Sequence, residues 1–194
     1  MIRIAVFASG SGSNAEKLIS HFSASSVGRI SLIITNNPSA GVIERANRLA
    51  VKCCVFSKAE FSNPSGVEQL LKEEKIDFII LAGFLLLVPG NLIRAFSGKI
   101  INIHPALLPK FGGKGFYGDR VHQSVIEHKE IISGITIHHV NDKFDEGNII
   151  FQAACHVEKT DSPESLAKKI HELEYTYFPV VSEKVIRTTF NIPA

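Results

Sequence analysis

The sequence has few cysteines and little excess of charge, and both absences narrow the class of protein. Its three cysteines are an odd number with no C-x-x-C pair, which argues against a disulfide framework and a zinc site. The net charge of +2 is too small, and its cations too scattered, for a nucleic-acid surface. We therefore expect a cytoplasmic protein with reduced thiols that does not bind nucleic acid.

Long apolar segments are also missing. The longest run, residues 78–88, is far shorter than the ~18 residues that a membrane-spanning helix needs. The first three residues lead directly into an apolar strand, so we expect no signal peptide. The sequence shows no internal repeat, low-complexity tract or interdomain linker. A chain of 194 residues with this pattern predicts a single domain and no membrane partner.

Strand and helix patterns alternate through the first hundred residues. Strands are predicted over residues 2–8, 30–35, 53–56, 78–82 and 100–103, and helices over residues 15–22, 41–49, 64–75 and 92–96. Strands that are apolar on both faces are typical of parallel sheets covered by helices. The sequence therefore predicts an α/β fold with a doubly wound, mainly parallel sheet flanked by helices.

The second half of the chain follows a different pattern. A glycine-rich loop is predicted over residues 110–118, a helix over 120–128, two strands over 134–140 and 149–157, and a long helix over 162–189. Ser162 is the expected N-cap of that last helix, followed by a first-turn proline.

Asn102 and His104 stand at the end of the strand predicted over residues 100–103. Residues two apart on a strand share a face, so the two side chains should point the same way. Pro105 cannot continue a strand ladder, which puts His104 at the carboxyl end of this strand. Open α/β sheets bind ligands at such ends, although a structural Asn beside a locally bonded His has the same pattern.

Gly10-x-Gly12-x-x-Ala15 follows the first strand and opens a helix, as in the loose dinucleotide fingerprint. A nicotinamide site also requires an acid at the end of the second strand, where Thr35-Asn36-Asn37 stands instead. The hydroxyls and amide of Ser9, Ser11, Ser13 and Asn14 suit a phosphate monoester at a helix start. A glycine turn with a serine cap is the structural alternative.

Two further segments have both a structural and a functional interpretation. The loop over residues 141–148 is acid-rich; a solvated turn explains it more simply than a metal site with His104, His138 or His139, since no ligand spacing supports one. The segment Leu85-Leu86-Leu87-Val88 is either core or the wall of a slot for a flat ligand, and its place after a strand end favours the slot.

Four motifs together resemble the phosphoribosylglycinamide formyltransferases, folate-dependent enzymes of purine synthesis. They are Ser11-Gly12-Ser13-Asn14, Leu81-Ala82-Gly83-Phe84, Asn102-Ile103-His104-Pro105-Ala106-Leu107-Leu108-Pro109-Lys110 and Asp142-x-x-Asp145-x-Gly147. Methionyl-tRNA formyltransferases and formyltetrahydrofolate deformylases look similar through the third motif, but they have additional domains. Many relatives carry an arginine where Leu86 stands and another near Pro64.

The resemblance implies transfer of the formyl group of 10-formyltetrahydrofolate, a cosubstrate, to the amine of 5-phosphoribosylglycinamide without a metal. It implies a Rossmann-related, formyltransferase-like domain over residues 1–194, with a phosphate-binding half (1–100) and a catalytic and folate-binding half (101–194). The implied residues fall into three groups. They are catalytic Asn102, His104 and Asp145; substrate-binding Gly12, Ser13, Asn14 and Glu174; and folate-binding Leu85, Leu86, Leu87, Val88 and Asn102.

The chemistry of these residue types fits such a reaction. The Asn102 amide can donate to a developing oxyanion, and the His104 imidazole can move protons near neutral pH. Asp145, if it reaches His104, should raise the pKa of that imidazole. A nicotinamide-dependent oxidoreductase, a metal-dependent hydrolase, a non-catalytic folate or nucleotide binder and a deformylase are the alternatives.

Overall fold

Strand β1 (Ile2–Phe7) lies inside the sheet, with a strand on each side, and its side chains alternate between two apolar cores. Ile4 and Val6 belong to one core cluster, and Ala5 and Phe7 belong to the other. A strand that is buried on both faces in this way must be covered by helices on both sides. The sequence of β1 therefore dictates a layered α/β arrangement.

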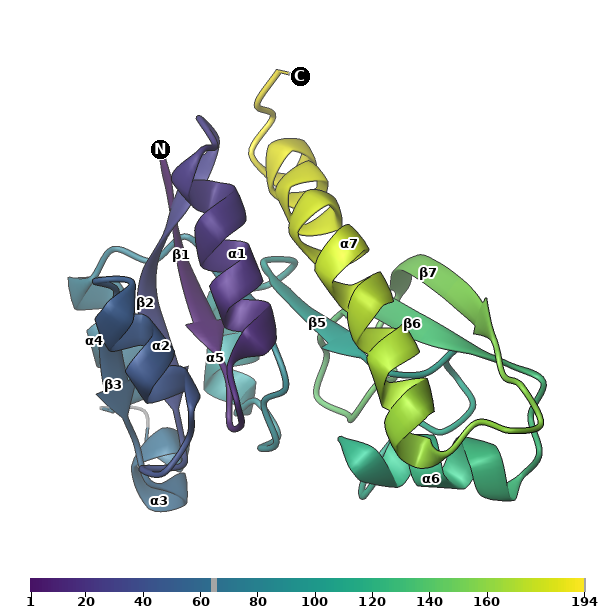
Figure 1. The fold of residues 1–194 in the computed structure, drawn as a ribbon. Coiled ribbons are helices and arrows are strands. Elements are labelled where there is room, and N and C mark those ends of the chain that lie inside the picture. The colour runs from purple at the N-terminus through teal and green to yellow at the C-terminus, as the bar shows by residue number, and fades with distance from the viewer. Residues whose placement is uncertain (64–65, 194) are drawn as a thin grey trace.

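The computed structural model describes residues 1–63 and 66–193 (Figure 1). After β1, the elements in chain order are α1 (Ser13–Ser23), β2 (Gly28–Thr35), α2 (Val42–Arg48), β3 (Lys52–Val55), α3 (Lys58–Ser62), α4 (Val67–Glu73), β4 (Phe78–Leu81), α5 (Gly90–Ala95), β5 (Ile100–His104), α6 (Asp119–Glu127), β6 (Ile132–His139), β7 (Ile149–His156) and α7 (Pro163–Thr189).

The strands form a seven-stranded sheet in the order β3-β2-β1-β4-β5-β6-β7. The ladders from β3 to β5 are parallel, and β6 and β7 are added antiparallel at the far edge. The chain builds outward from β1 through β2 to β3 and then returns to the other side at β4. The predicted doubly wound, mainly parallel sheet is confirmed, and its switch point lies between β1 and β4.

Helices cover both faces of the sheet. Buried side chains of α1, α2 and α7 pack in the core cluster that contains Ile4 and Val6, while α3, α4 and α5 pack in the cluster that contains Ala5 and Phe7. In Figure 1, α7 runs diagonally across the molecule beside α1 and continues to β6 and α6. This long helix joins the two halves of the chain.

Most predicted elements are present, with shifted ends. Ser162 caps α7 as predicted, its side chain accepting from the Ser165 N–H. The short helix α3 was not predicted, although Ser57 and Glu60 form a capping box at its start. The helix predicted over residues 64–75 corresponds to α4, and its predicted start at Pro64 lies outside the described residues.

Candidate active site

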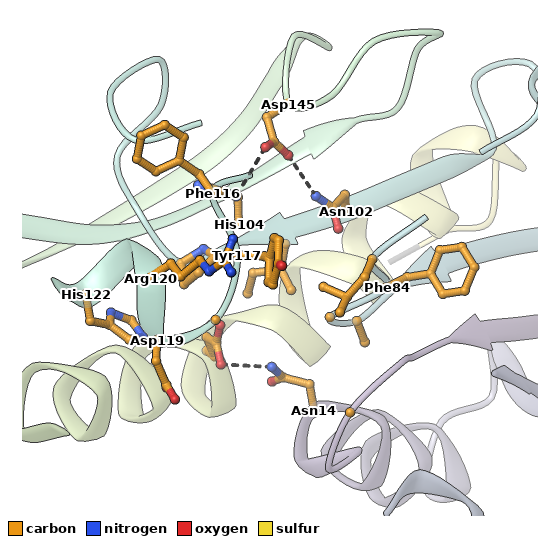
Figure 2. A pocket seen from close by; sticks show the side chains of 18 of the residues that line it. Asn14, Phe84, Asn102, His104, Phe116, Tyr117, Asp119, Arg120, His122 and Asp145 are labelled. Carbon is orange, nitrogen blue, oxygen red and sulfur yellow. Dashed lines mark hydrogen bonds and ion pairs between the residues drawn. The ribbon is translucent and has the colours of Figure 1, made fainter. Parts of the chain in front are cut away.

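A cleft of about 610 Å³ opens at the carboxyl ends of β1, β4 and β5 (Figure 2). Its walls come from the loop after β1, the segment after β4, the end of β5, the glycine-rich loop over residues 110–118, α6, the loop before β7, and α7. Because these strands are parallel neighbours, their carboxyl ends meet at one edge of the sheet. Segments far apart in sequence therefore share one cavity.

Asn102 and His104 project from β5 toward the same carboxylate. The distance from Asn102 Nδ2 to Asp145 Oδ1 is 3.4 Å, and that from His104 Nδ1 to Asp145 Oδ2 is 3.5 Å. The prediction that these two side chains share one face of the strand is confirmed. His104 is almost completely buried and lies at the end of β5, where Pro105 follows.

Asp145 reaches this position from the loop between β6 and β7. Its backbone is left-handed, with φ of 56°, a conformation that aspartate tolerates better than most residues. The loop returns so tightly that a Cβ on Gly147 would lie 1.6 Å from the His139 carbonyl oxygen. The sequence Asp145-x-Gly147 therefore has a steric reason, and the turn brings the carboxylate over β5.

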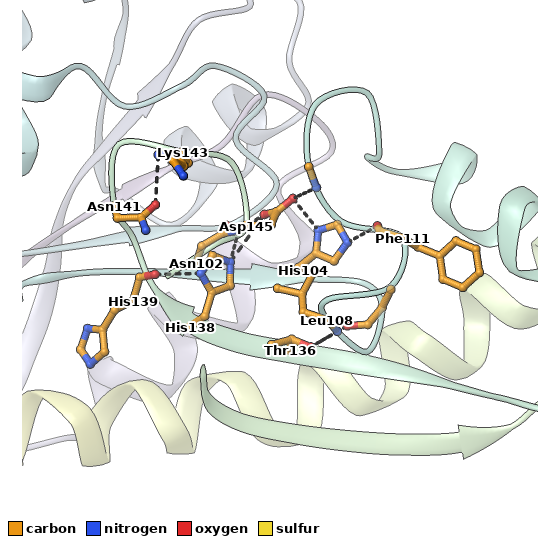
Figure 3. A network of polar contacts seen from close by, with 12 residues as sticks. Asn102, His104, Leu108, Phe111, Thr136, His138, His139, Asn141, Lys143 and Asp145 are labelled. Carbon is orange, nitrogen blue, oxygen red and sulfur yellow. Dashed lines mark hydrogen bonds and ion pairs between the residues drawn. The ribbon is translucent and has the colours of Figure 1, made fainter. Parts of the chain in front are cut away.

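His138 is a further member of this polar cluster (Figure 3). Its Nδ1 lies 2.8 Å from the His139 carbonyl oxygen, which can only accept, so Nδ1 carries a proton. In the neutral ring Nε2 is then free to accept from Asn102 Nδ2, 3.0 Å away. This contact orients the Asn102 amide, with its nitrogen toward His138 and Asp145.

Sequence reasoning considered His138 only as a metal ligand and did not include it in the catalytic group. The residue joins the cluster because β6 pairs with β5 in a register that sets Asn102 opposite His138. Its neighbour His139 points to the other side, as strand alternation predicts. No pattern within either strand reveals the register between them, so this contact could not be predicted from the sequence.

Burial and charge act on the His104–Asp145 pair in opposite directions. Burial lowers the pKa of His104 from its ordinary 6.5, and the Asp145 carboxylate opposes this without reversing it. For Asp145, burial raises the pKa, but contacts with His138, His104 and the Gly113 N–H together hold it below 3.8. Asp145 does raise the pKa of His104, as expected, but desolvation is larger and the net shift is downward.

The glycine-rich loop binds this pair through its backbone. His104 Nε2 donates to the Phe111 carbonyl oxygen at 2.7 Å, and the Gly113 N–H donates to Asp145 Oδ2 at 2.9 Å. Both nitrogens of His104 therefore face groups of the protein. The position of this loop controls the surroundings of both side chains.

Gly12, Ser13 and Asn14 line the opposite end of the cleft at the start of α1. Gly12 has φ of 78° and is the N-cap without a side-chain cap bond, so first-turn N–H groups are available to an anion. Ser9, which the sequence included among the phosphate-binding hydroxyls, is engaged elsewhere. Its Oγ donates to Asn36 Oδ1 and accepts from the Leu85 N–H.

Glu174 on α7 meets Asn14 across this end of the cleft. Its Oε2 accepts from Asn14 Nδ2 at 2.8 Å and from His171 Nδ1 at 2.9 Å. The hydrogen bond to Glu174 raises the pKa of His171 above 6.5 despite partial burial. The structure thus brings Glu174 to the predicted substrate residues and adds His171, which sequence reasoning missed.

The four residues predicted to line a folate site, Leu85 to Val88, differ in their surroundings. Leu85 lines the cleft and is half exposed. Val88 is buried in the core cluster that contains Phe7, Leu86 packs against that cluster, and Leu87 is partly exposed and is not one of the cleft-lining residues. Ala82 and Phe84 are the other apolar residues of this segment in the cleft wall.

Within residues 1–63 and 66–193, no group of three or more His, Cys, Asp or Glu side chains is arranged to hold a metal ion. In the same ranges, no helix is long and apolar enough to cross a membrane.

The sequence matches the family described as formyl transferase over residues 2–182. A chloroplastic phosphoribosylglycinamide formyltransferase of Arabidopsis thaliana is 44% identical over 92% of this chain and 64% of its own length. The Vigna unguiculata counterpart is 37% identical and is covered over 60%. The chain thus spans less than two thirds of either plant protein. The Bacillus subtilis phosphoribosylglycinamide formyltransferase is 34% identical over 96% of this chain and 95% of its own.

Solved structures agree with these relatives. The crystal structure of phosphoribosylglycinamide formyltransferase from Bacillus halodurans has a TM-score of 0.87 and 36% identity, with 98% of each chain covered. The Anaplasma phagocytophilum enzyme also has a TM-score of 0.87, with 33% identity over 96% of this chain and 87% of that one.

Proposed function

The chain belongs to the formyl transferase family, and on this premise we propose that it is a phosphoribosylglycinamide formyltransferase. It transfers the formyl group of 10-formyltetrahydrofolate to the amine of 5-phosphoribosylglycinamide, a step of purine synthesis. One observation carries the proposal. Asn102, His104 and Asp145 converge at one end of a cleft whose other end is formed by Gly12 and Glu174.

We assign the two ends of the cleft to the two parts of the ribonucleotide. The first-turn N–H groups at Gly12, Ser13 and Asn14 bind its phosphate, which the positive end of the helix dipole favours. Glu174 binds the ribose hydroxyls, since both its protein contacts use Oε2 and Oε1 has no partner among the described residues. The amine then extends toward β5.

The folate belongs on the side of the cleft formed by the segment after β4. Leu85 supplies apolar contact there, while Leu86, Leu87 and Val88 contribute backbone groups rather than cleft-lining side chains. Asn102 borders both substrates, because it lines the cleft between this segment and Asp145.

In the proposed reaction the substrate amine attacks the formyl carbon, and the carbonyl oxygen gains negative charge. Asn102 donates one amide N–H to that oxygen. Its Nδ2 contacts His138 at 3.0 Å and Asp145 at 3.4 Å, and we expect the longer contact, to Asp145, to break when the oxyanion binds. The bond between the formyl carbon and N10 of the folate then breaks. Loss of such a donor typically costs about 3 kcal/mol of barrier.

A proton must also move from the attacking amine to the departing N10. The lowered pKa of His104 leaves its ring ready to accept that proton at neutral pH, and Asp145 stabilises the imidazolium that forms. Because Nε2 carries the proton donated to the Phe111 carbonyl oxygen, the lone pair of the neutral ring is on Nδ1 beside Asp145. The ring therefore accepts the proton at Nδ1 through a water and gives the Nε2 proton to N10 once the Phe111 contact opens. No metal takes part in this scheme.

The alternatives predict different observations. A nicotinamide site is disfavoured because Asn36 at the end of β2, where a ribose-binding acid is required, is bonded to Ser9. A metal-dependent hydrolase would lose activity with a chelator. The cytoplasmic location stays a prediction, since two of the relatives are named chloroplastic. The absence of nucleic-acid binding and the functional division at residue 100 also stay predictions.

The decisive assay follows turnover of 10-formyltetrahydrofolate by absorbance, with and without 5-phosphoribosylglycinamide. We expect loss of the formyl group only when the acceptor is present, and no effect of a chelator. Equal loss without the acceptor would identify a deformylase, and no loss in either reaction would identify a non-catalytic binder.

A further inference from the structure

His122 on α6 is a buried histidine of the cleft that the proposed chemistry does not use. Only 3% of the residue is exposed, and it nonetheless belongs to the cleft wall. Figure 2 shows it on the α6 side with Asp119 and Arg120, opposite Asn14 on α1. A buried polar ring without a protein partner normally costs stability, so its presence in a ligand cleft requires an explanation.

The two ring nitrogens of His122 differ in their access to the cleft. Nδ1 is sealed from solvent and has no hydrogen-bond partner. Nε2 has no partner among the described residues either, but it is not sealed. Nε2 is therefore the atom through which this ring can meet a ligand.

The surroundings determine which nitrogen carries the proton. Burial lowers the pKa of His122, and the neighbouring His171 adds to this effect, so the ring is neutral at pH 7. A buried N–H without an acceptor is rarer in proteins than a buried acceptor without a donor. The proton therefore resides on Nε2, which presents a donor to the cleft.

The charges around His122 place it near the substrate-binding end. Glu174 and Asp119 raise the pKa of the ring, whereas His171 and His104 lower it, so these four groups lie close enough to act on it. His122 thus shares the cleft wall with the residue assigned to the ribose and with the catalytic histidine. A ligand hydroxyl that donates to Glu174 still has a lone pair to accept from another group.

We propose that His122 is a further substrate-positioning residue, whose Nε2–H donates to a ribose hydroxyl of the substrate held by Glu174. This inference rests on the proposed function and adds to it a donor for the sugar. This hydrogen bond would select a pentose phosphate with free hydroxyls as the ligand. It would also hold the sugar at a set distance from the reacting amine.

Steady-state kinetics of His122→Phe and His122→Gln test the inference. Phenylalanine keeps a ring and removes the donor, so we expect KM for 5-phosphoribosylglycinamide to rise about 10-fold, with kcat and the folate KM within about 2-fold. Glutamine restores an N–H donor and should return KM to within about 3-fold of wild type. His156→Phe, at an exposed histidine on β7, is the control and should change none of these values.

Nuclear magnetic resonance of the wild-type imidazole nitrogens gives a second test that needs no folded variant. We expect the His122 ring to have the Nε2–H tautomer and its Nε2 signal to shift when ribose 5-phosphate is added. An Nδ1–H tautomer, an unchanged signal at saturating ribose 5-phosphate or a failure of that ligand to bind would overturn the inference, as would an equal loss of kcat and both KM values in His122→Phe.

These outcomes are separate from the test of the proposed function. If the wild-type protein transfers the formyl group and the His122 variants match it, only the His122 inference fails. If the wild-type protein does not transfer it but ribose 5-phosphate shifts the His122 signal, the function is wrong and the sugar contact stands.

Discussion

Asp145 organises the site at the scale of single residues. Its carboxylate lies within 3.5 Å of ring nitrogens of both His104 and His138, and it accepts from the Gly113 N–H. Four neighbours on three segments therefore depend on one side chain in a left-handed backbone conformation. Strain of this kind persists only where the surrounding contacts compensate for it, as they do here.

Truncation of either strand residue should abolish most of the activity. For His104→Ala we expect kcat to fall by roughly 10²- to 10⁴-fold, since a positioned proton carrier is lost. For Asn102→Ala we expect kcat to fall by roughly 10²- to 10³-fold, since a hydrogen-bond donor to the oxyanion is lost. Steady-state kinetics should show KM values nearly kept. His156→Ala, at an exposed histidine, is the control. More than a tenth of the wild-type kcat in His104→Ala or Asn102→Ala would refute the role assigned to that residue.

Asp145→Asn should shift the pH dependence of the reaction. The carboxylate is the main group that opposes the lowering of the His104 pKa by burial, so its loss should lower that pKa further. The acidic limb of kcat/KM should therefore move to lower pH. A pH–rate profile that superimposes on wild type would remove Asp145 from the proton path.

The two cleft histidines His104 and His171 should titrate on opposite sides of 6.5. Burial lowers the pKa of His104, whereas the Glu174 hydrogen bond raises that of His171. The His171–Glu174 pair thus stabilises the fold below the unfolded pKa, and this contribution is lost as pH rises through the folded one. His104 destabilises the fold as pH falls below 6.5. Imidazole proton titrations measure both pKa values, and Glu174→Gln should lower that of His171 more than that of His104, on which Glu174 is the smallest influence. A His104 pKa above that of His171 in the wild-type protein would contradict this assignment.

At the scale of elements, the two glycines of the loop between β1 and α1, Gly10 and Gly12, differ in the space around them. Gly12 has φ of 78°, and a Cβ there would lie 2.6 Å from Val42 Cβ on α2. Gly10 has open space around it. The Gly10-x-Gly12 pattern therefore reflects, at its second glycine, close packing of α2 against the start of α1 rather than a dinucleotide.

Gly12→Ala should be strongly destabilising. Overpacking costs about 1–3 kcal/mol and a left-handed alanine about 1–2 kcal/mol more. For a chain of this length that corresponds to a Tm decrease of roughly 4–20 °C, measurable by thermal denaturation. Gly10→Ala in the same loop is the control and should change Tm by less than about 2 °C. Equal Tm values for the two variants would contradict the packing argument.

At the scale of the whole molecule, α7 makes the two halves of the chain interdependent. Its buried side chains pack in the same core cluster as those of α1 and β1, and its Glu174 bonds to Asn14. The substrate end of the cleft therefore combines residues 1–100 with the last helix. A shift of α7 would change both the core and the site.

Phe178 on α7 gives a direct test of this interdependence. It is fully buried in the cluster with Ile4 and Phe78, so Phe178→Ala should cost about 3–5 kcal/mol. That corresponds to a Tm decrease of roughly 6–20 °C. Val180→Ala, exposed on the same helix, should change stability by less than about 0.5 kcal/mol. A single unfolding transition by circular dichroism and tyrosine fluorescence is expected, and two separate transitions would show that the halves are independent.

Local patterns in the sequence were enough to predict the fold class and most element positions. They also predicted that Asn102 and His104 share one face of their strand. Apolar periodicity and strand alternation act within a few residues, so they can be read from the chain alone. They also indicated the acidic loop that contains Asp145. The role of His138 was not accessible, because it depends on the register between β5 and β6.

The direction of the His104 pKa and the split of residues 85–88 between cleft and core were decided only by the tertiary structure. Desolvation depends on everything packed around a ring, and the sequence predicts the charge partner but not the depth of burial. Val88 is in the core because neighbouring helices cover that face of the segment, while Leu85 faces the cleft. The sequence by itself determined which groups are present and on which strands, and long-range packing determined their distances and their protonation.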